Sequence, residues 1–149
     1  SFYGKRHCHS EHAKILLAEL IGKNPLELLN HLEDIVSDNK IEIYKKEIEA
    51  LEKGIPIQYV LGTVNFYGNI FYIDKSVLIP RFETEELVEN TLNYINNYFN
   101  PSDLKIIDLG TGSGCIGITL KKNLPNSNVT LVDISDSALE VAKENAANL

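Results

Sequence analysis

The 149-residue chain contains 44% hydrophobic residues and carries a formal net charge of −7. This composition is that of a globular protein, and no apolar run reaches the roughly 18 residues of a membrane span. Because the negative charge disfavours binding that neutralises nucleic-acid phosphates, we expect no direct nucleic-acid partner, no membrane partner and a cytoplasmic location. Cys8 and Cys115 are far apart, and we expect both to be reduced thiols.

Three segments in the first part of the chain have the apolar spacing of helices. Ser10 is placed to cap a helix that stops at Gly22, and Pro25 begins a second helix. A third helix is predicted from about residue 37 to residue 53. The apolar stripes of the three helices are, in order, Ala13, Leu16, Leu17 and Leu20; Leu26, Leu29 and Leu32; and Ile41, Tyr44, Ile48 and Leu51. Residues 1–62 are therefore predicted to form a helical bundle.

The apolar period changes after this helical segment. Residues 64–67 and 70–73 flank Gly68 and Asn69, a pair that suits a tight two-residue turn between strands. The sequence predicts a β-hairpin linker over residues 63–79. A helix is expected next, from about residue 84 to residue 99, with several acidic residues in its first turns that complement the helix dipole.

The last part of the chain alternates strands and helices. Residues 105–109 are predicted to be a buried strand, followed by closely spaced glycines and a helix to about residue 123. A second strand is expected over residues 128–133, and Ser135 or Asp136 is placed to cap a final helix. This order is typical of an α/β fold with a parallel sheet, here the start of a Rossmann-like sheet over residues 80–149. Since such sheets have about six strands, we expect the remainder to lie outside this sequence.

The glycines between the predicted strand and helix indicate a nucleotide-like ligand. Residues 112–117 match Gly-x-Gly-x-x-Gly, which leaves NAD open. Asp108, however, precedes the glycines, where a carboxylate repels a pyrophosphate and favours a cation such as the ammonium of a methionine moiety. Asp133 follows the second strand and can accept the ribose hydroxyls of either cofactor. Together with Gly-x-Gly-x-Gly over residues 110–114, this pattern resembles the Class I S-adenosylmethionine-dependent methyltransferases.

Three further segments make the resemblance more specific. Residues 56–62 read Pro-Ile-Gln-Tyr-Val-Leu-Gly, residues 65–68 read Asn-Phe-Tyr-Gly, and residues 77–85 read Val-Leu-Ile-Pro-Arg-Phe-Glu-Thr-Glu. In this order and spacing the chain resembles the peptide chain release factor glutamine methyltransferases, the HemK family. There a helical domain and a β-hairpin precede a Pro-Arg-Pro-Glu-Thr-Glu segment and then Asp-x-Gly-Thr-Gly-Ser-Gly. Phe82 stands where the family usually has Pro.

The resemblance implies both a site and a reaction. Residues 1–62 would recognise the substrate, and S-adenosyl-L-methionine would be held by seven residues: Asp108, Gly110, Thr111, Gly112, Ser113, Gly114 and Asp133. The methyl group would pass to the side-chain amide nitrogen of the glutamine in the Gly-Gly-Gln motif of class 1 peptide chain release factors. The family orients that amide with an Asn-Pro-Pro-Tyr motif, which these 149 residues lack. No catalytic residue is therefore assigned, and this chain alone is expected to be inactive.

Other functions stay open on the sequence alone. The same cofactor class includes adenine-N6 nucleic-acid methyltransferases, the glycine pattern also allows an NAD-binding Rossmann dehydrogenase, and the helical unit could act as a docking module. Near the start, His7, Cys8 and His9 crowd together, but their spacing matches no zinc pattern and we expect no metal site. Arg81 is a candidate either for closing the site or for pairing with a helix carboxylate.

Overall fold

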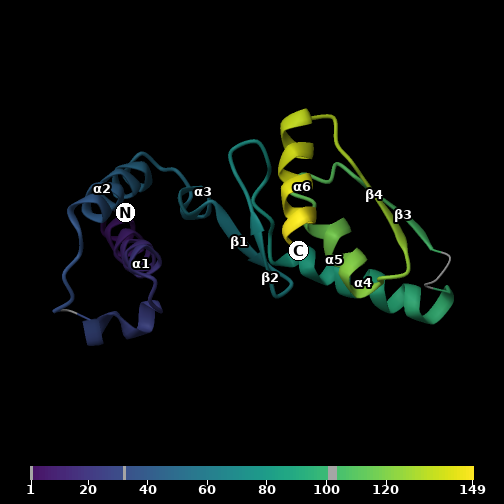
Figure 1. Cartoon of the computed structure of the whole chain (residues 1–149), viewed down its shortest axis with the longest axis horizontal. Coiled ribbons are helices and arrows are strands. Elements are labelled where there is room, and N and C mark those ends of the chain that lie inside the picture. Colours follow the sequence, from purple (N-terminus) through teal and green to yellow (C-terminus); the bar gives the residue numbers. More distant parts are fainter. Residues whose placement is uncertain (1, 32, 101–103) are drawn as a thin grey trace. The chain divides into compact units, whose positions relative to one another are not determined.

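The computed structural model describes residues 2–31, 33–100 and 104–149, with side chains from Ser10 onward. It divides into two compact units, Ser1–Leu61 and Gly62–Leu149. The first is helical, and the second contains the hairpin as well as the alternating strands and helices (Figure 1). No helix in the described part of the chain is both long and apolar enough to cross a membrane.

The described residues of the first unit form four helical segments around a small core. They are α1 (Phe2–Ile21), the 3-10 helix η1 (Pro25–His31), α2 (Asp38–Glu52) and α3 (Ile57–Leu61). The buried core residues are Leu16, Leu51 and Ile57, against which Tyr44 and Ile48 pack. The Tyr44 hydroxyl also donates a hydrogen bond to the Ala13 carbonyl at 3.2 Å, which joins α2 to α1.

Two details of the helical prediction are wrong. Ser10 lies inside α1 and does not cap it, because the helix begins at Phe2 and no proline interrupts the preceding residues. The second helix is η1, a 3-10 helix. Its Leu26 and Leu29 are 88% and 79% exposed, so they do not form a buried stripe. Leu32 lies outside the described residues, and the one-turn helix α3 was not anticipated.

The predicted hairpin is confirmed, but its turn lies one residue earlier than expected. Strands β1 (Thr63–Phe66) and β2 (Asn69–Tyr72) pair antiparallel with Phe66 opposite Asn69. The turn residues are Tyr67 and Gly68, with φ of 49° and 73°, as a type I′ turn requires. This register places Phe66 and Phe71 on one buried face, where their rings meet edge to face with centroids 6.0 Å apart.

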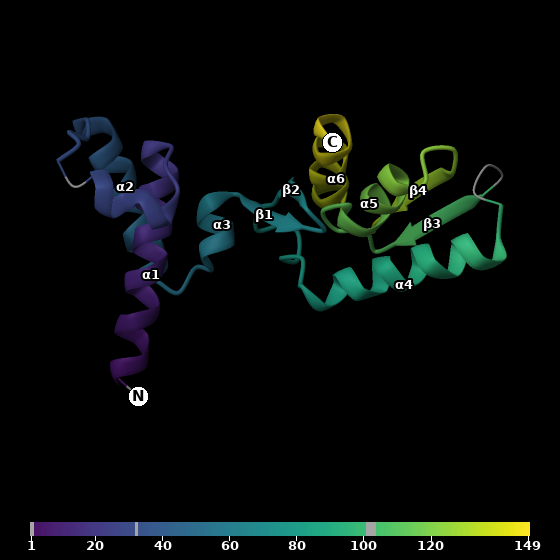
Figure 2. The same ribbon diagram turned by 90° about the horizontal axis from the view of Figure 1, so that it is seen from below.

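The remaining elements confirm the predicted α/β fold. They are α4 (Glu83–Tyr98), β3 (Lys105–Leu109), α5 (Cys115–Asn123), β4 (Asn128–Val132) and α6 (Asp136–Asn148). β3 and β4 pair in parallel, with Lys105 opposite Asn128, which is the start of a Rossmann-like sheet. α4 packs against α5, and Figure 2 shows both helices with the strand pair.

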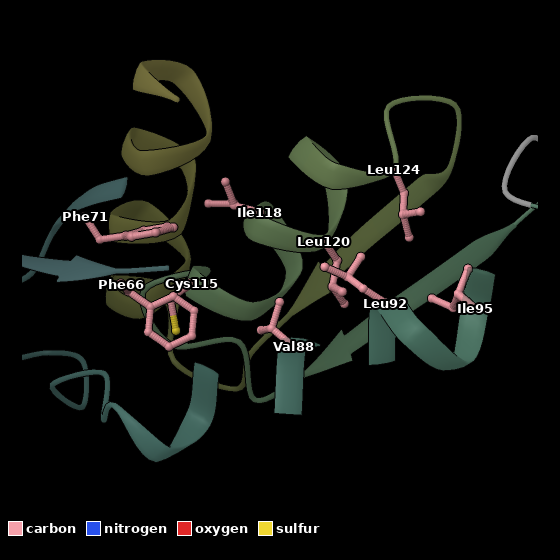
Figure 3. Close-up of a cluster of buried hydrophobic side chains, with 9 residues drawn as sticks. All are labelled: Phe66, Phe71, Val88, Leu92, Ile95, Cys115, Ile118, Leu120 and Leu124. Atoms are coloured by element: carbon pink, nitrogen blue, oxygen red, sulfur yellow. The ribbon is translucent and has the colours of Figure 1, made fainter. Parts of the chain in front are cut away.

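The core of the second unit lies between the hairpin, α4 and α5. Figure 3 shows nine of its buried side chains, which point toward one another: Phe66, Phe71, Val88, Leu92, Ile95, Cys115, Ile118, Leu120 and Leu124. Ile106 and Leu131 pack against this cluster from one face of the strand pair. The opposite face is apolar and open, since Ile107 and Leu109 are 60% and 71% exposed. Parallel sheets are normally covered on both faces.

Candidate cofactor site

The loop between β3 and α5 is shaped by glycines in a left-handed conformation. Gly110, Gly112 and Gly114 have φ of 72°, 54° and 82°, values that residues with a Cβ adopt at a cost. A Cβ added at Gly110 or Gly112 would meet nothing within 4 Å. These two glycines are therefore needed for the course of the backbone, and the space beside them is open to a ligand.

Two further glycines allow close packing behind the loop. A Cβ at Gly114 would lie 2.6 Å from Ile118 Cδ1 and 3.3 Å from the Ala142 Cβ. A Cβ at Gly117, in the first turn of α5, would lie 2.2 Å from Leu131 Cδ2. The helix can approach β4 this closely only because Gly117 has no side chain. The glycines thus divide into a pair that faces open space and a pair that faces the core.

Asp108 joins the strand, the loop and the helix through one carboxylate oxygen. Its Oδ2 accepts hydrogen bonds from the Thr111 hydroxyl at 2.7 Å and from the Gly117 N–H at 3.0 Å. Among the described residues its Oδ1 accepts none, and the residue is half-buried. Asp108 therefore stabilises the loop and retains one oxygen for a donor on a ligand.

Asp133 holds the other side of the loop. Its Oδ2 accepts the Gly112 N–H at 2.9 Å, and its Oδ1 accepts the Ser135 N–H at 3.0 Å. The backbone N–H of Ser135, followed by that of Gly112, lowers the pKa of Asp133, so the carboxylate is charged at neutral pH. A carboxylate accepts about four hydrogen bonds. The two oxygens therefore keep acceptor capacity for two ligand hydroxyls.

The seven predicted cofactor residues lie together in this loop and at the adjoining strand ends. The N–H groups of Gly110 and Thr111 both donate to the Val132 carbonyl, at 2.8 and 3.0 Å, and the Gly114 N–H donates to the Thr111 carbonyl at 2.8 Å. Thr111 and Ser113 are buried. Because the Thr111 hydroxyl is bonded to Asp108, that side chain supports the loop from within.

The charges around the loop favour a nucleoside with a cationic group over a dinucleotide. A pyrophosphate beside the loop would meet the Asp108 and Asp133 carboxylates, and no lysine or arginine in the described residues bonds to the loop. An ammonium and two ribose hydroxyls are donors, which suits carboxylate acceptors. The residues present therefore fit S-adenosyl-L-methionine.

Sequence reasoning missed three contacts that shape this region. The buried side chain of Asn145, in α6, bonds to the Ser113 carbonyl at 2.8 Å. Glu85, one of the acidic residues expected to complement the helix dipole, accepts the N–H of Tyr67 at 2.9 Å and so holds the hairpin turn. The bond between Gly117 and Asp108 was also unforeseen. A signal for Asn145 was present, since it lies three and seven residues after the buried Ala142 and Ala138.

The other residues that the sequence singled out form no reactive or metal-binding group among the described side chains. Cys115 packs in the apolar cluster, and burial raises the pKa of its thiol, so it is an unreactive neutral group near pH 7. Arg81 is exposed and forms no ion pair with any described residue. The side chains of His7, Cys8 and His9 lie outside the described part. The side chains that are described include no group of three metal-ligating residues.

Comparison with known proteins identifies the family. Residues 9–62 match the family model described as PrmC N-terminal domain, and residues 100–149 match the one described as methyltransferase domain. The release factor glutamine methyltransferase of Bacillus cereus is 40% identical over 136 residues, which cover 91% of this chain and 48% of that protein. The chain belongs to the release factor glutamine methyltransferase family.

Other members of the family show the same agreement. The release factor glutamine methyltransferase of Leptospira interrogans is 41% identical over 137 residues, which are 92% of this chain and 47% of that protein. That of Flavobacterium psychrophilum is 51% identical over 96 residues, 64% of this chain and 34% of that protein. The chain spans about half the length of the curated relatives it matches. The predicted resemblance is therefore confirmed.

Proposed function

We propose that this chain binds S-adenosyl-L-methionine in the loop 110–114 and forms the methyl-donor half of a glutamine methyltransferase. The full protein would methylate the side-chain amide of the glutamine in the Gly-Gly-Gln motif of class 1 release factors. The observation that carries the proposal is a pair of carboxylates bonded to this loop: Asp108 accepts the Thr111 hydroxyl and Asp133 accepts the Gly112 N–H. Membership of the family supports the choice of acceptor.

The roles of individual residues follow from their geometry. Asp133, charged and half-exposed, would accept the two ribose hydroxyls through the lone pairs that Gly112 and Ser135 leave unused. Oδ1 of Asp108 would accept a hydrogen bond from the ammonium group in the methionine moiety of S-adenosyl-L-methionine. The open side of Gly110 and Gly112 lets the ligand approach the backbone closely. When bound, S-adenosyl-L-methionine supplies a methyl group on a positively charged sulfur.

The acceptor half of the reaction needs residues outside this sequence. An amide nitrogen is a poor nucleophile, so the enzyme must orient it and accept its hydrogens. The family motif Asn-Pro-Pro-Tyr, which would do so, is absent from these 149 residues. We therefore propose that the chain alone binds the cofactor without transferring the methyl group. We further propose that residues 1–62 recognise the release factor, that residues 63–79 link them to the methyltransferase part, and that the protein acts in the cytoplasm.

Thermal denaturation with three nucleotides tests the cofactor. We expect S-adenosyl-L-methionine and S-adenosyl-L-homocysteine to raise the melting temperature of the chain, because a ligand that binds only the folded state stabilises it. NAD should leave the melting temperature unchanged. A shift with NAD and none with S-adenosyl-L-methionine would contradict the proposal and favour a dehydrogenase.

Mass spectrometry tests the acceptor. A class 1 release factor and an adenine-containing DNA duplex are each incubated with the full-length protein and S-adenosyl-L-methionine, and in parallel with the 149-residue chain. We expect methylation of the Gly-Gly-Gln peptide by the full-length protein only. Methylated adenine would replace the proposed acceptor, and release-factor methylation by the chain would show that it already contains a catalytic acceptor site.

A further inference from the structure

Asn145 is a buried polar residue that connects the hairpin to the glycine loop. Its side chain is 1% exposed, on the stripe of α6 that also contains Ala138, Val141 and Ala142. Its Oδ1 accepts the N–H of Tyr72 at 2.7 Å, while its Nδ2 donates to the Tyr72 carbonyl at 2.9 Å and to the Ser113 carbonyl at 2.8 Å. The two partners lie on separate elements, β2 and the loop before α5.

The bonds to Tyr72 imitate those of a neighbouring strand. Tyr72 is opposite Thr63 in the hairpin, and its N–H and carbonyl point away from β1 toward α6. A primary amide offers one acceptor and two donors, so it satisfies both backbone groups and has one donor left for Ser113. Figures 1 and 2 both place β2 beside α6. The bonding pattern fixes the amide orientation, because the reverse orientation would set two N–H donors against each other.

Few other side chains can do the same. Aspartate has no donor when charged, and its carboxylate would face the carbonyls of Tyr72 and Ser113. Alanine would leave three backbone groups without partners in a buried place, which is unfavourable for each of them. The position therefore requires asparagine for its hydrogen bonds as well as for its size.

We infer that Asn145 is a positioning residue for the cofactor: it fixes the Ser113 carbonyl, and with it the course of the loop 110–114, to the edge of the hairpin. The inference rests on the proposed function of that loop. Asn145 is linked to the ligand only through the backbone of Ser113, so it takes no part in the chemistry. Its effect is to hold the loop in the conformation that binds, which a ligand would otherwise have to impose at a cost in affinity.

The test compares affinities at matched stability. Titration calorimetry with S-adenosyl-L-methionine is carried out on the 149-residue chain and on the variants Asn145→Ala, Asn145→Asp and Ile95→Ala. Ile95 is a buried core residue of α4, and Figure 3 places it at the opposite end of the cluster from Phe66 and Phe71. Lys122→Ala is a second control, since Lys122 Nζ bonds to Asn69 Oδ1 in the hairpin and does not contact the loop. Melting temperatures are recorded for all variants, and titrations are run well below them.

Both Asn145 variants should raise the dissociation constant at least tenfold. Ile95→Ala, with a similar fall in melting temperature, and Lys122→Ala should change it less than twofold. Equal affinities for the Asn145 variants and the unchanged chain would overturn the inference, and so would a loss of affinity in Ile95→Ala as large as theirs. If Asn145→Ala does not fold, the isosteric Asn145→Asp decides alone. Absence of binding by the unchanged chain would instead reject the proposed cofactor, and the inference with it.

Discussion

The two units of the chain differ in the size of their buried apolar clusters. In Gly62–Leu149 nine residues form one buried cluster, which includes Cys115, the residue that directly follows the glycine loop, and Ile118 in the first turns of α5. In Ser1–Leu61 the buried cluster has three members, while Leu29 and Ile35 are 79% and 99% exposed. Both units keep apolar side chains at the surface, since Ile107 and Leu109 of the second unit are 60% and 71% exposed. Only in the second unit does a large buried cluster adjoin the glycine loop, so core packing and loop geometry are linked there.

The largest difference between the units is expected for truncated side chains. Phe71→Ala removes a ring that is fully buried in the second unit and should lower the free energy of unfolding by about 4 kcal/mol. Leu29→Ala, at an exposed position of the first unit, should change it by less than about 0.5 kcal/mol. Urea denaturation followed by circular dichroism measures both. A loss of similar size in the two variants would show that Leu29 is buried in solution.

A glycine substitution separates packing from backbone conformation. Gly117→Ala places a methyl group against Leu131. The overpacking should lower the free energy of unfolding by about 3 kcal/mol, and the higher helix propensity of alanine should offset about 1 kcal/mol of that, so the net loss is about 2 kcal/mol. Gly22→Ala meets no atom within 4 Å and has φ of 70°, so it should lose only about 1 kcal/mol. Gly117→Ala should also weaken cofactor binding, because the Asp108 contact moves, and Gly22→Ala should not. Unchanged stability of Gly117→Ala would refute the close approach of α5 to β4.

The carboxylate of Asp133 should make the second unit sensitive to acid. Its pKa in the folded chain is lowered, first by the Ser135 N–H and then by that of Gly112. Its contribution to stability is therefore complete above the unfolded pKa of about 3.9 and is lost as the pH falls through the folded pKa. The difference in melting temperature between the unchanged chain and Asp133→Asn should be largest near neutral pH. It should become progressively smaller as the pH falls below about 4.

A matched control for this titration lies in the first unit. Asp34 is paired with His31 at 2.8 Å and its side chain is 52% exposed, so Asp34→Asn should change the melting temperature little at any pH. A difference for Asp133→Asn that stays constant from neutral pH to pH 3 would contradict the hydrogen-bonded carboxylate.

The smallest effect concerns the departure from the family at Phe82. This residue has φ of −56° and lies just before α4 with 78% of its surface exposed. Proline adopts φ near −65°, so the backbone already has the conformation that the family residue needs. Phe82→Pro should leave stability unchanged or raise it by about 0.5 kcal/mol. Thermal denaturation measures this, and a marked loss would show that the Phe82 ring or N–H makes a stabilising contact.

The elements around the glycine loop were predictable because several local signals agree there. Glycines, the Ser135 cap and apolar periodicity all mark the same boundaries, and the structure places β3 at Lys105–Leu109 as expected. Ser135 Oγ indeed accepts the Ala138 N–H. Asp108, Asp133 and the glycines between them also meet as the strand order requires.

The features that sequence reasoning missed depend on contacts between distant residues. The hairpin turn lies at Tyr67 and Gly68, where the Tyr67 N–H bonds to Glu85, 18 positions later in the chain. Asn145 bonds to Tyr72, 73 positions earlier in the chain, so its role appears only in the folded protein. The start of α1 was misplaced because a good capping residue, Ser10, does not end a helix that can extend past it.

The most direct test of the proposed site is a titration of the labelled chain with S-adenosyl-L-methionine, followed through its backbone amide resonances. We expect the largest shifts on residues 110–114 and 133–135, where the loop and Asp133 would bind the ligand. NAD at the same concentration should leave these resonances in place. Saturable shifts confined to other residues, or equal shifts with NAD, would contradict the assignment of this loop to S-adenosyl-L-methionine.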